Sequence, residues 1–329
     1  MKGLTGWARC PGTCGEWVQG AKNGIPFLVG CPVNRFVEAR AVIQLIDGIT
    51  SEKAHSTELK GWKWSLPEGK EKTRLAIEKF TRKNNFPPLR GQIDLSSELP
   101  TGKGMASSTA DMIAAMVAVS YSLQIPWDAE MLARLVLEVE PTDPVMFEGI
   151  TEFAHRDGSY VKSLGTVIPA HLLMMDWGGS LDTQSFNAQQ GLSAHYRKNE
   201  MEIRAALTLF NEGMLTGDLE KIARASTVSA RCNQEINPKP EFKNFLSWVH
   251  HMGGLGVITA HSGTLLAGVF PFNLPQTLRR NIQAEARVHF RAEAVEWIET
   301  YGGGIQGGVE HARWKSVRGD GEIRKEFIY

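Results

Sequence analysis

The segment at residues 100–110, PTGKGMASSTA, combines two glycines with three consecutive hydroxyl residues, and the apolar run DMIAAMVAVSYSL follows it directly. Gly102 and Gly104 allow left-handed backbone geometry and a close approach to a ligand. The residues after Gly104 are expected to begin a helix, whose unpaired N–H groups and dipole attract anions. The hydroxyl groups can hold phosphate oxygens or a magnesium ion. We therefore predict that this loop is a phosphate cradle for a nucleotide.

The cradle differs from the two common phosphate loops. The P-loop needs G-x-x-x-x-G-K-[ST], whereas the only lysine here, Lys103, stands between the two glycines. The fingerprint G-x-G-x-x-G needs glycine where Ser107 stands, and no acidic ribose ligand is evident downstream. A turn followed by small residues is also ordinary helix capping, so a purely structural interpretation stays open. The predicted nucleotide contacts are Pro100, Gly102, Lys103, Gly104, Met105, Ala106, Ser107, Ser108 and Thr109.

The segment EVEPTD at residues 138–143 is the natural source of carboxylates for such a site. It leaves a predicted helix that Pro141 ends, so its polar groups can turn towards a cleft. Magnesium prefers oxygen ligands and usually takes one or two from the protein, and Glu140 is the predicted metal ligand. The alternatives are glutamates exposed at a helix end and, for Asp143, a turn-forming aspartate.

Two further segments are rich in glycine. Residues 9–20 read RCPGTCGEWVQG, in which Pro11 and Gly12 predict a turn before Gly15 and Glu16. Residues 253–264 read GGLGVITAHSGT and precede the apolar run LLAGVF. Together with the central P-x-x-x-G-M-A-S-S-T-A, these segments have the order and spacing of the three motifs of the GHMP kinases, which the chain resembles.

The finer spelling, PGTCGE, EPTD and AHSGT, resembles the L-threonine kinases that supply cobalamin side-chain synthesis, in which ATP phosphorylates the threonine hydroxyl. The resemblance covers most of the chain at motif level. It implies ATP and Mg²⁺ as cofactors and an α+β, two-lobed GHMP kinase fold with the nucleotide bound between the lobes. We place the lobes at residues 1–165 and 166–329. The alternatives are homoserine kinase, another small-alcohol kinase of this family, or a non-catalytic nucleotide-binding sensor.

The resemblance also implies roles for individual residues. Ser108 matches the family's magnesium-liganding hydroxyl, and Asp143 matches the aspartate after the second helix, near the substrate hydroxyl. Ser108 and Asp143 are therefore the predicted catalytic residues, and Ser108 and Glu140 the predicted metal ligands. The predicted substrate contacts are Glu16, Cys14, Asp143, His261 and Ser262, while Arg9, Arg35 or Arg231 could receive a substrate carboxylate. For Cys14 the alternative is a small residue packed beneath a turn.

The elements that must position these groups alternate between strands and helices. Strands are predicted around a turn within residues 27–42, at 62–66 and 92–95, about a turn at Gly165 within 159–175, and at 257–259, 265–270 and 294–300. Helices are predicted at residues 73–84, 108–123, 128–140, 200–212, 218–230, 240–252 and 274–286. Met112, Met116 and Ser120 follow the i, i+4 rhythm of a helix, and Asp128 is a predicted N-cap.

Composition excludes several other classes. The chain has 329 residues and 42% hydrophobic content, enough for a full core, and 36 basic residues balance 36 acidic ones. No net charge favours nucleic acid or a membrane surface, and no apolar run approaches the ~20 residues of a membrane span. With no signal-peptide-like start, a cytoplasmic location is expected. The four cysteines lack CxxC spacing, which disfavours zinc. L-threonine is the predicted small-molecule partner, and the oligomeric state stays open, a homodimer included.

Overall fold

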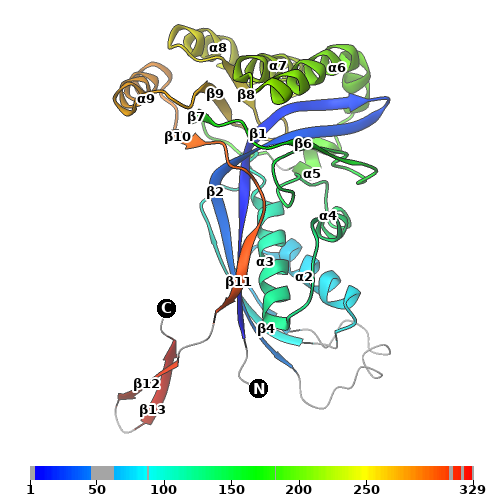
Figure 1. The fold of residues 1–329 in the computed structure, drawn as a ribbon, viewed down its shortest axis with the longest axis vertical. Coiled ribbons are helices and arrows are strands. Elements are labelled where there is room, and N and C mark those ends of the chain that lie inside the picture. Colours follow the sequence, from blue (N-terminus) through cyan, green and yellow to red (C-terminus); the bar gives the residue numbers. More distant parts are fainter. Residues whose placement is uncertain are drawn as a thin grey trace.

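The computed structural model describes residues 4–45, 63–86, 89–181, 183–310, 314–319 and 322–327. Its two longest strands, β1 (Thr5–Lys22) and β2 (Ile25–Leu45), pair antiparallel along their lengths. Figure 1 shows them running through both ends of the main body. The other strands of the main sheet are β3 (Lys63–Ser65), β4 (Leu89–Ser97), β5 (Ile150–Phe153), β6 (Val161–Gly165), β7 (Ala170–Asp176), β8 (Gly256–Thr259), β9 (Leu266–Pro271), β10 (Ala294–Glu299) and β11 (Gln306–Glu310).

Sheet order links both halves of the chain. The main path is β10-β7-β9-β8-β1-β2-β4-β3, with β11 paired to β1 and β5 paired to β2 and β6. A separate pair is formed by β12 (Trp314–Gly319) and β13 (Glu322–Phe327). Because β8 and β11 from the second half pair with β1 from the first, one sheet crosses the predicted boundary at residue 165. The division into lobes at that residue stays a prediction.

The predicted turns in the first 45 residues are wrong. The Pro11-Gly12 segment lies inside β1, where the pairing register with β2 shifts between Pro11 and Gly12 and again on both sides of Glu16. The strands expected around a turn within residues 27–42 form the continuous β2. The reversal occurs instead at Asn23 and Gly24, which both have positive φ (54° and 77°). Asn-Gly is the preferred pair for a two-residue hairpin turn, and this signal was missed.

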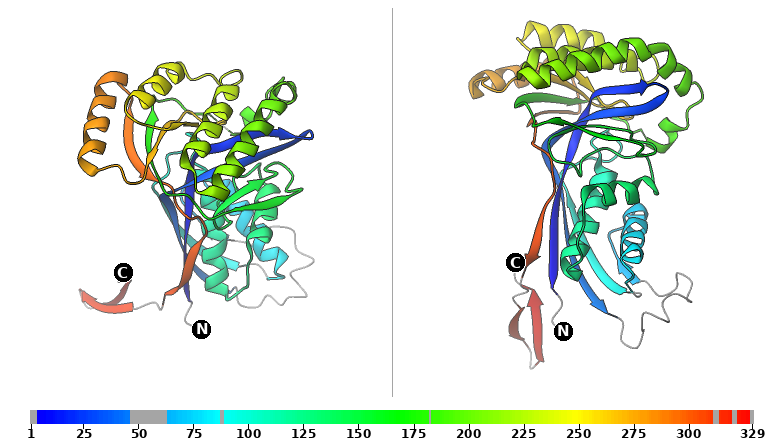
Figure 2. Two further views of the ribbon diagram at one scale, coloured as in Figure 1. Left: turned by 45° about the horizontal axis from the view of Figure 1, so that its top comes forward. Right: turned by 45° about the vertical axis from the view of Figure 1, so that its right-hand side comes forward.

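The helices are α2 (Glu71–Lys83), α3 (Ser107–Leu123), α4 (Ala129–Leu137), α5 (Thr183–Asn187), α6 (Leu192–Thr216), α7 (Leu219–Asn233), α8 (Phe242–His251) and α9 (Gln276–Phe290). In Figure 2, α2, α3 and α4 lie together on one side of the long strands, and α6, α7 and α8 cover the sheet at the other end. The predicted helices are confirmed with shifted ends, but α5 and the first two turns of α6 were not predicted. Among the described helices, none is long and apolar enough to cross a membrane.

Helix ends follow the predicted chemistry. The Asp128 side chain accepts a hydrogen bond from the Met131 N–H at 2.7 Å and caps α4. Gly253 follows Met252, the C-cap of α8, with φ of 81°, the left-handed conformation common after a helix. Of the predicted strand at residues 62–66, Lys63–Ser65 forms β3, while Trp62 lies outside the described residues.

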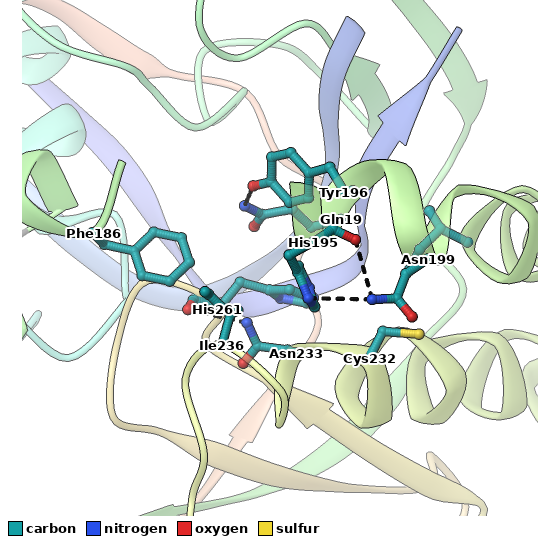
Figure 3. A pocket seen from close by; sticks show the side chains of 11 residues that line it. Gln19, Phe186, His195, Tyr196, Asn199, Cys232, Asn233, Ile236 and His261 are labelled. Atoms are coloured by element: carbon teal, nitrogen blue, oxygen red, sulfur yellow. Dashed lines mark hydrogen bonds between the residues drawn. The ribbon is translucent and has the colours of Figure 1, made fainter. Parts of the chain in front are cut away.

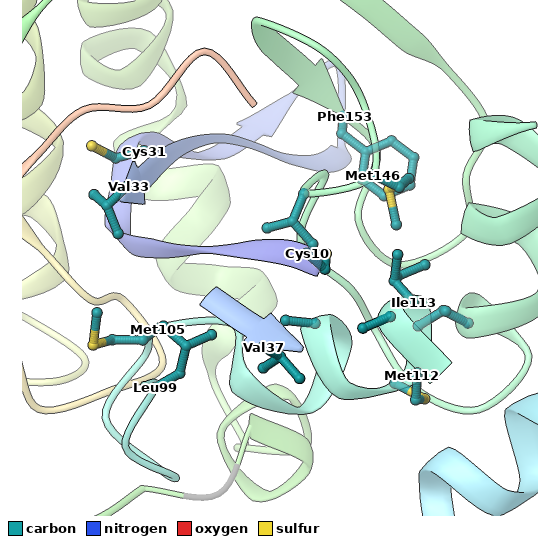
Figure 4. Close-up of a cluster of buried hydrophobic side chains, with 14 of the residues drawn as sticks. Cys10, Cys31, Val33, Val37, Leu99, Met105, Met112, Ile113, Met146 and Phe153 are labelled. Carbon is teal, nitrogen blue, oxygen red and sulfur yellow. The ribbon is translucent and has the colours of Figure 1, made fainter. Parts of the chain in front are cut away.

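Helix α3 lies in the centre of the core and not at its surface. Every residue from Thr109 to Ser120 is buried, so the helix is enclosed on all sides, beyond the single face that its rhythm predicted. Met112 and Ile113 pack with Cys10 and Val37 of the long strands in the cluster shown in Figure 4. A buried helix that cannot shift fixes the position of the loop before it, which is the predicted phosphate cradle.

Candidate active site

A cleft of about 800 Å³ opens at the start of α3. Its walls are the first residues of α2, the loop before α3, the segment from Glu140 to Asp143, and Glu16 and Ser262 from the other two glycine-rich segments. These five stretches, far apart in the sequence, therefore meet at one site. The cleft is large enough for a nucleotide and a small substrate together.

The three glycine-rich segments touch through their backbones. The Thr13 N–H donates to the Met105 carbonyl at 3.1 Å, and the Gly15 N–H donates to the Gly104 carbonyl at 3.2 Å. From the third segment, the Thr264 N–H donates to the Lys103 carbonyl at 3.1 Å. The loop before α3 is thus clamped between the other two segments.

Glycine is required where these backbones meet. A Cβ at Gly104, whose φ is 87°, would lie 2.3 Å from the Ala260 Cβ. A Cβ at Gly263 would lie 2.2 Å from the Lys103 carbonyl oxygen, and a Cβ at Gly15 2.4 Å from that of Thr259. At Gly104 the added atom therefore collides with the third segment, so this glycine serves loop-to-loop packing as well as backbone shape.

The start of α3 is suited to bind an anion. Its N-cap, Ala106, has the left-handed φ of 57°, which turns the chain sharply into the helix. No side chain caps the first N–H groups, and the first turn holds no acidic residue. Ala106, Ser107 and Ser108 line the cleft. Free N–H groups at the positive end of a helix dipole are a favourable site for phosphate oxygens.

Ser108 and Glu140 form the oxygen pair that the sequence predicted. The Ser108 hydroxyl donates to Glu140 Oε1 at 2.5 Å, and Lys72 Nζ donates to Glu140 Oε2 at 2.5 Å. Beside them, the Thr109 and Thr142 hydroxyls are 2.9 Å apart, which ties the start of α3 to the segment after Pro141.

The donor set fits magnesium that also binds phosphate. Ser108 and Glu140 are hard oxygen ligands, and they lie next to the anion-binding helix start. Within the described part of the chain, no three His, Cys, Asp or Glu side chains form a metal cluster. A metal ion here would thus take most of its ligands from phosphate and water, as magnesium usually does.

Asp143 reaches the cleft without a partner in the described structure. It is half-buried, and no described residue donates a hydrogen bond to it or forms an ion pair with it. Burial, and after it the negative charges of the nearby Glu16 and Glu140, raise the pKa of Asp143 to about 8. An unpaired carboxyl group with a raised pKa in a cleft is a candidate proton acceptor.

Glu16 is fixed from behind by His261. Glu16 Oε2 accepts the His261 backbone N–H at 2.9 Å and lies 2.8 Å from His261 Nδ1. On the other side of the ring, His261 Nε2 lies 3.0 Å from the Ser229 hydroxyl. Figure 3 shows His261 in a small buried cavity of about 10 Å³, which has room for about one water molecule, with Gln19 and Tyr196 nearby. His261 therefore orients Glu16 and has no free ring nitrogen for a substrate.

Other predicted residues lie away from the cleft. Cys14 is buried behind it, and burial followed by the Glu16 charge raises the pKa of its thiol to about 12, so it is a packing residue. Pro100 is exposed at the start of the loop. Lys103 forms an ion pair with Asp176 at 2.6 Å, which joins the loop to β7. Its contact with phosphate stays a prediction.

The predicted arginines are also elsewhere. Arg9 pairs with Glu38 and stacks over Phe36, and Arg35 pairs with Glu296. Arg231 is exposed in the last turn of α7. None of these three lines the cleft.

Five charged residues that line the cleft were not predicted: Glu68, Lys70, Glu71, Lys72 and Asp111. Lys70 and Lys72 stand at the start of α2, and Lys70 pairs with Asp111 of α3 at 2.6 Å. Their signal in the sequence is the run GKEKT before the predicted helix at 73–84. Helical spacing identified the face of this helix that packs against the core, but it does not tell which residues of the first turn line a cleft.

Comparison with known proteins agrees with this geometry. Residues 71–148 match the GHMP kinases N terminal domain. The L-threonine kinase of Salmonella typhimurium is 31% identical over 265 residues, which cover 79% of this chain and 81% of that protein. The L-threonine kinase of Citrobacter freundii is 28% identical over 267 residues, which cover 79% and 84%.

Solved structures with the same fold include two kinases. The homoserine kinase of Cytophaga hutchinsonii has a TM-score of 0.65 at 15% identity, covering 93% of this chain and 98% of that one. The mevalonate kinase of L. major, in complex with R-mevalonate, has a TM-score of 0.63 at 12% identity, covering 92% and 97%. The predicted α+β GHMP kinase fold is confirmed. By its 31% identity to a curated relative over about four fifths of both chains, this protein belongs to the GHMP kinases.

Proposed function

We propose that this chain is an ATP-dependent kinase that phosphorylates the hydroxyl group of L-threonine to give O-phospho-L-threonine, a product that would feed cobalamin side-chain synthesis. One observation carries the proposal: the uncapped start of α3, the Ser108–Glu140 pair and the unpaired Asp143 share one cleft. The identity to two L-threonine kinases supports the choice of substrate. ATP would lie between the halves at 1–165 and 166–329.

Phosphate binding and charge neutralisation belong to α3 and its partners. The free N–H groups of the first turn would bind the phosphate groups of ATP. Ser108 and Glu140 would hold Mg²⁺, which when bound neutralises charge on the phosphates. The backbone contacts from Thr13, Gly15 and Thr264 keep this loop rigid, so little reorganisation is needed when the nucleotide binds.

Asp143 would orient the threonine hydroxyl and accept its proton. Its pKa of about 8 arises from burial and from the negative charges of Glu16 and Glu140. Cations bound at those two carboxylates would oppose this rise and favour the ionised form. Asp143 then becomes a carboxylate when metal nucleotide and substrate are both in place.

Glu16 would bind the ammonium group of the amino-acid substrate. It is buried, it lines the cleft, and His261 holds it through two contacts to one oxygen. With the ammonium group at Glu16 and the hydroxyl at Asp143, the site would select substrates by the distance between these two groups. Ser262, which also lines the cleft, remains a proposed substrate contact.

ADP release tests this function against its alternatives. Magnesium-ATP would be offered with L-threonine, L-serine, L-homoserine and mevalonate in turn. L-threonine should give the fastest ADP release. Preference for homoserine would favour a homoserine kinase, and nucleotide binding without any ADP release would favour a sensor.

A further inference from the structure

Lys72 and Glu140 form the closest ion pair in the described lining of the cleft, and they come from different elements. Lys72 stands in the first turn of α2, whereas Glu140 follows α4. Lys72 Nζ is 2.5 Å from Glu140 Oε2, while the other oxygen, Oε1, accepts the Ser108 hydroxyl. Both oxygens of this carboxylate are therefore occupied, one by a cation and one by a neutral donor.

The two partners differ in exposure. The Glu140 side chain is 3% exposed, so its charge cannot be screened by water and needs a cation beside it. The Lys72 side chain is 39% exposed, and its flexible stem gives its ammonium group freedom to move within the cleft. The carboxylate is enclosed by the protein, whereas the lysine borders solvent.

A divalent cation and the Lys72 ammonium group would bind the same carboxylate. Two cations a few ångströms apart on one buried carboxylate repel each other strongly. The phosphate groups bound at the start of α3 would be anions within reach of Lys72, because Ser108 belongs to that helix and already touches Glu140. An ammonium group displaced from Glu140 would therefore move to phosphate.

The other lysines around the loop are tied elsewhere. Lys70 pairs with Asp111, and the Lys70 charge opposes the rise that burial causes in the pKa of Asp111. Lys103 pairs with Asp176, which is nearly buried at the end of β7. Neither of these carboxylates is a predicted metal ligand, so metal binding at Glu140 leaves both pairs intact.

We propose that Lys72 competes with the magnesium ion for Glu140 and transfers to the nucleotide phosphates when the metal nucleotide binds. Lys72 then has two roles: it keeps Glu140 in place before binding, and it adds positive charge to the phosphates afterwards. The inference rests on the proposed kinase function for the identity of the ligand.

The test is Lys72→Met, with Lys79→Met as its control. Lys79 lies on the same helix and pairs with Glu138 at 2.6 Å, and neither residue lines the cleft. Calorimetry would measure binding of the non-hydrolysable ATP analogue AMP-PNP over a series of Mg²⁺ concentrations. Circular dichroism would establish that each variant is folded, and Lys72→Gln would replace Lys72→Met if the latter is not.

Competition makes two predictions of opposite sign. At saturating Mg²⁺, Lys72→Met should bind AMP-PNP about tenfold more weakly, because a charged contact to phosphate is lost. The Mg²⁺ concentration that gives half of the metal-dependent gain in affinity should fall several-fold, because no ammonium group competes for Glu140. Lys79→Met should change neither value.

A lysine that only positions Glu140 would give the opposite metal result. The half-saturating Mg²⁺ concentration would then rise or stay unchanged in Lys72→Met, and this outcome would overturn the proposal. Failure of the kinase function itself would look different, because the wild-type protein would then bind no AMP-PNP or phosphorylate no alcohol.

Discussion

At the scale of single residues, the site depends on which hydrogen-bond and ion-pair partners its three carboxylates have. Glu16 has the His261 contacts, Glu140 has Ser108 and Lys72, and Asp143 has no described partner. The helix end at Pro141 predicted that Glu140 and Asp143 face the site, and the resemblance to the GHMP kinases added Glu16. The sequence could not predict their partners, since Lys72 and His261 are 68 and 245 residues away from the acids they contact.

Asp143→Asn should separate proton transfer from nucleotide binding. Asparagine keeps the shape of the side chain but accepts no proton, so kcat should fall by about 10²–10⁴-fold while ATP affinity changes little. Steady-state kinetics and calorimetry measure the two quantities. Asp128→Asn is a matched control, because Asp128 only caps α4 and asparagine caps equally well. Nearly full activity in Asp143→Asn would show that Asp143 is a turn residue only.

Asp143 should also make folding stability depend on pH. Its pKa is about 8 in the folded chain, well above the ordinary aspartate value of about 3.9 expected on unfolding. Between these values the folded state holds a proton that the unfolded state has lost, so this contribution to stability is lost as pH rises from about 4 to about 8.

Urea denaturation without nucleotide measures this effect. From about pH 5 to about pH 8, the unfolding free energy of the wild type should fall relative to that of Asp143→Asn. Asp157→Asn is the control, since Ser159 hydrogen bonds lower the pKa of that exposed aspartate and it cannot cause such a fall. Parallel curves for the wild type and Asp143→Asn would contradict the raised pKa.

At the scale of elements, local signals predicted helices better than strands. Asp128, Asp218 and Gly253 mark helix ends that the structure confirms. The Gly-rich β11 and the proline-containing part of β1 have weak local preference for a strand, and only pairing with distant neighbours makes them strands. The course of β1 through the first glycine-rich segment could therefore not be derived from that segment alone.

Gly104→Ala should test the packing between the second and third glycine-rich segments. The new Cβ would meet Ala260 at 2.3 Å and would also strain a backbone φ of 87°. Gly24→Ala is the matched control, because Gly24 has a φ of 77° but no atom within 4 Å of the added Cβ. The control should lose only the roughly 1–2 kcal/mol of left-handed strain.

Gly104→Ala should lose more stability than Gly24→Ala in urea unfolding. Its ATP affinity should also drop, because the loop before α3 must shift. Gly104→Val, with a larger and β-branched side chain, should abolish ATP binding. Equal stability losses in Gly104→Ala and Gly24→Ala, with ATP affinity retained, would refute the close contact between the segments.

At the scale of the whole molecule, the site exists because β1 passes between the two ends of the sheet. Its first residues pair with β11, and at Glu16 it touches β8. The cradle before α3 then lies against both, which brings residues near 15, 104 and 263 into contact. The order and spacing of the three motifs predicted that these segments lie together, but only through the resemblance to a family. The physical cause, a single sheet shared by both halves, became evident only from the pairing of the strands.

The central claim is that this assembled cleft transfers phosphate to L-threonine, with the ammonium group at Glu16 and the hydroxyl at Asp143. The most direct measurement is kcat/KM for L-threonine and for L-homoserine with magnesium-ATP. Homoserine carries its hydroxyl one carbon further from the amino-acid head group, a displacement of about 1 Å or more that costs roughly a hundredfold in rate. We predict a preference for L-threonine of that order, and comparable kcat/KM values for the two substrates would contradict the account.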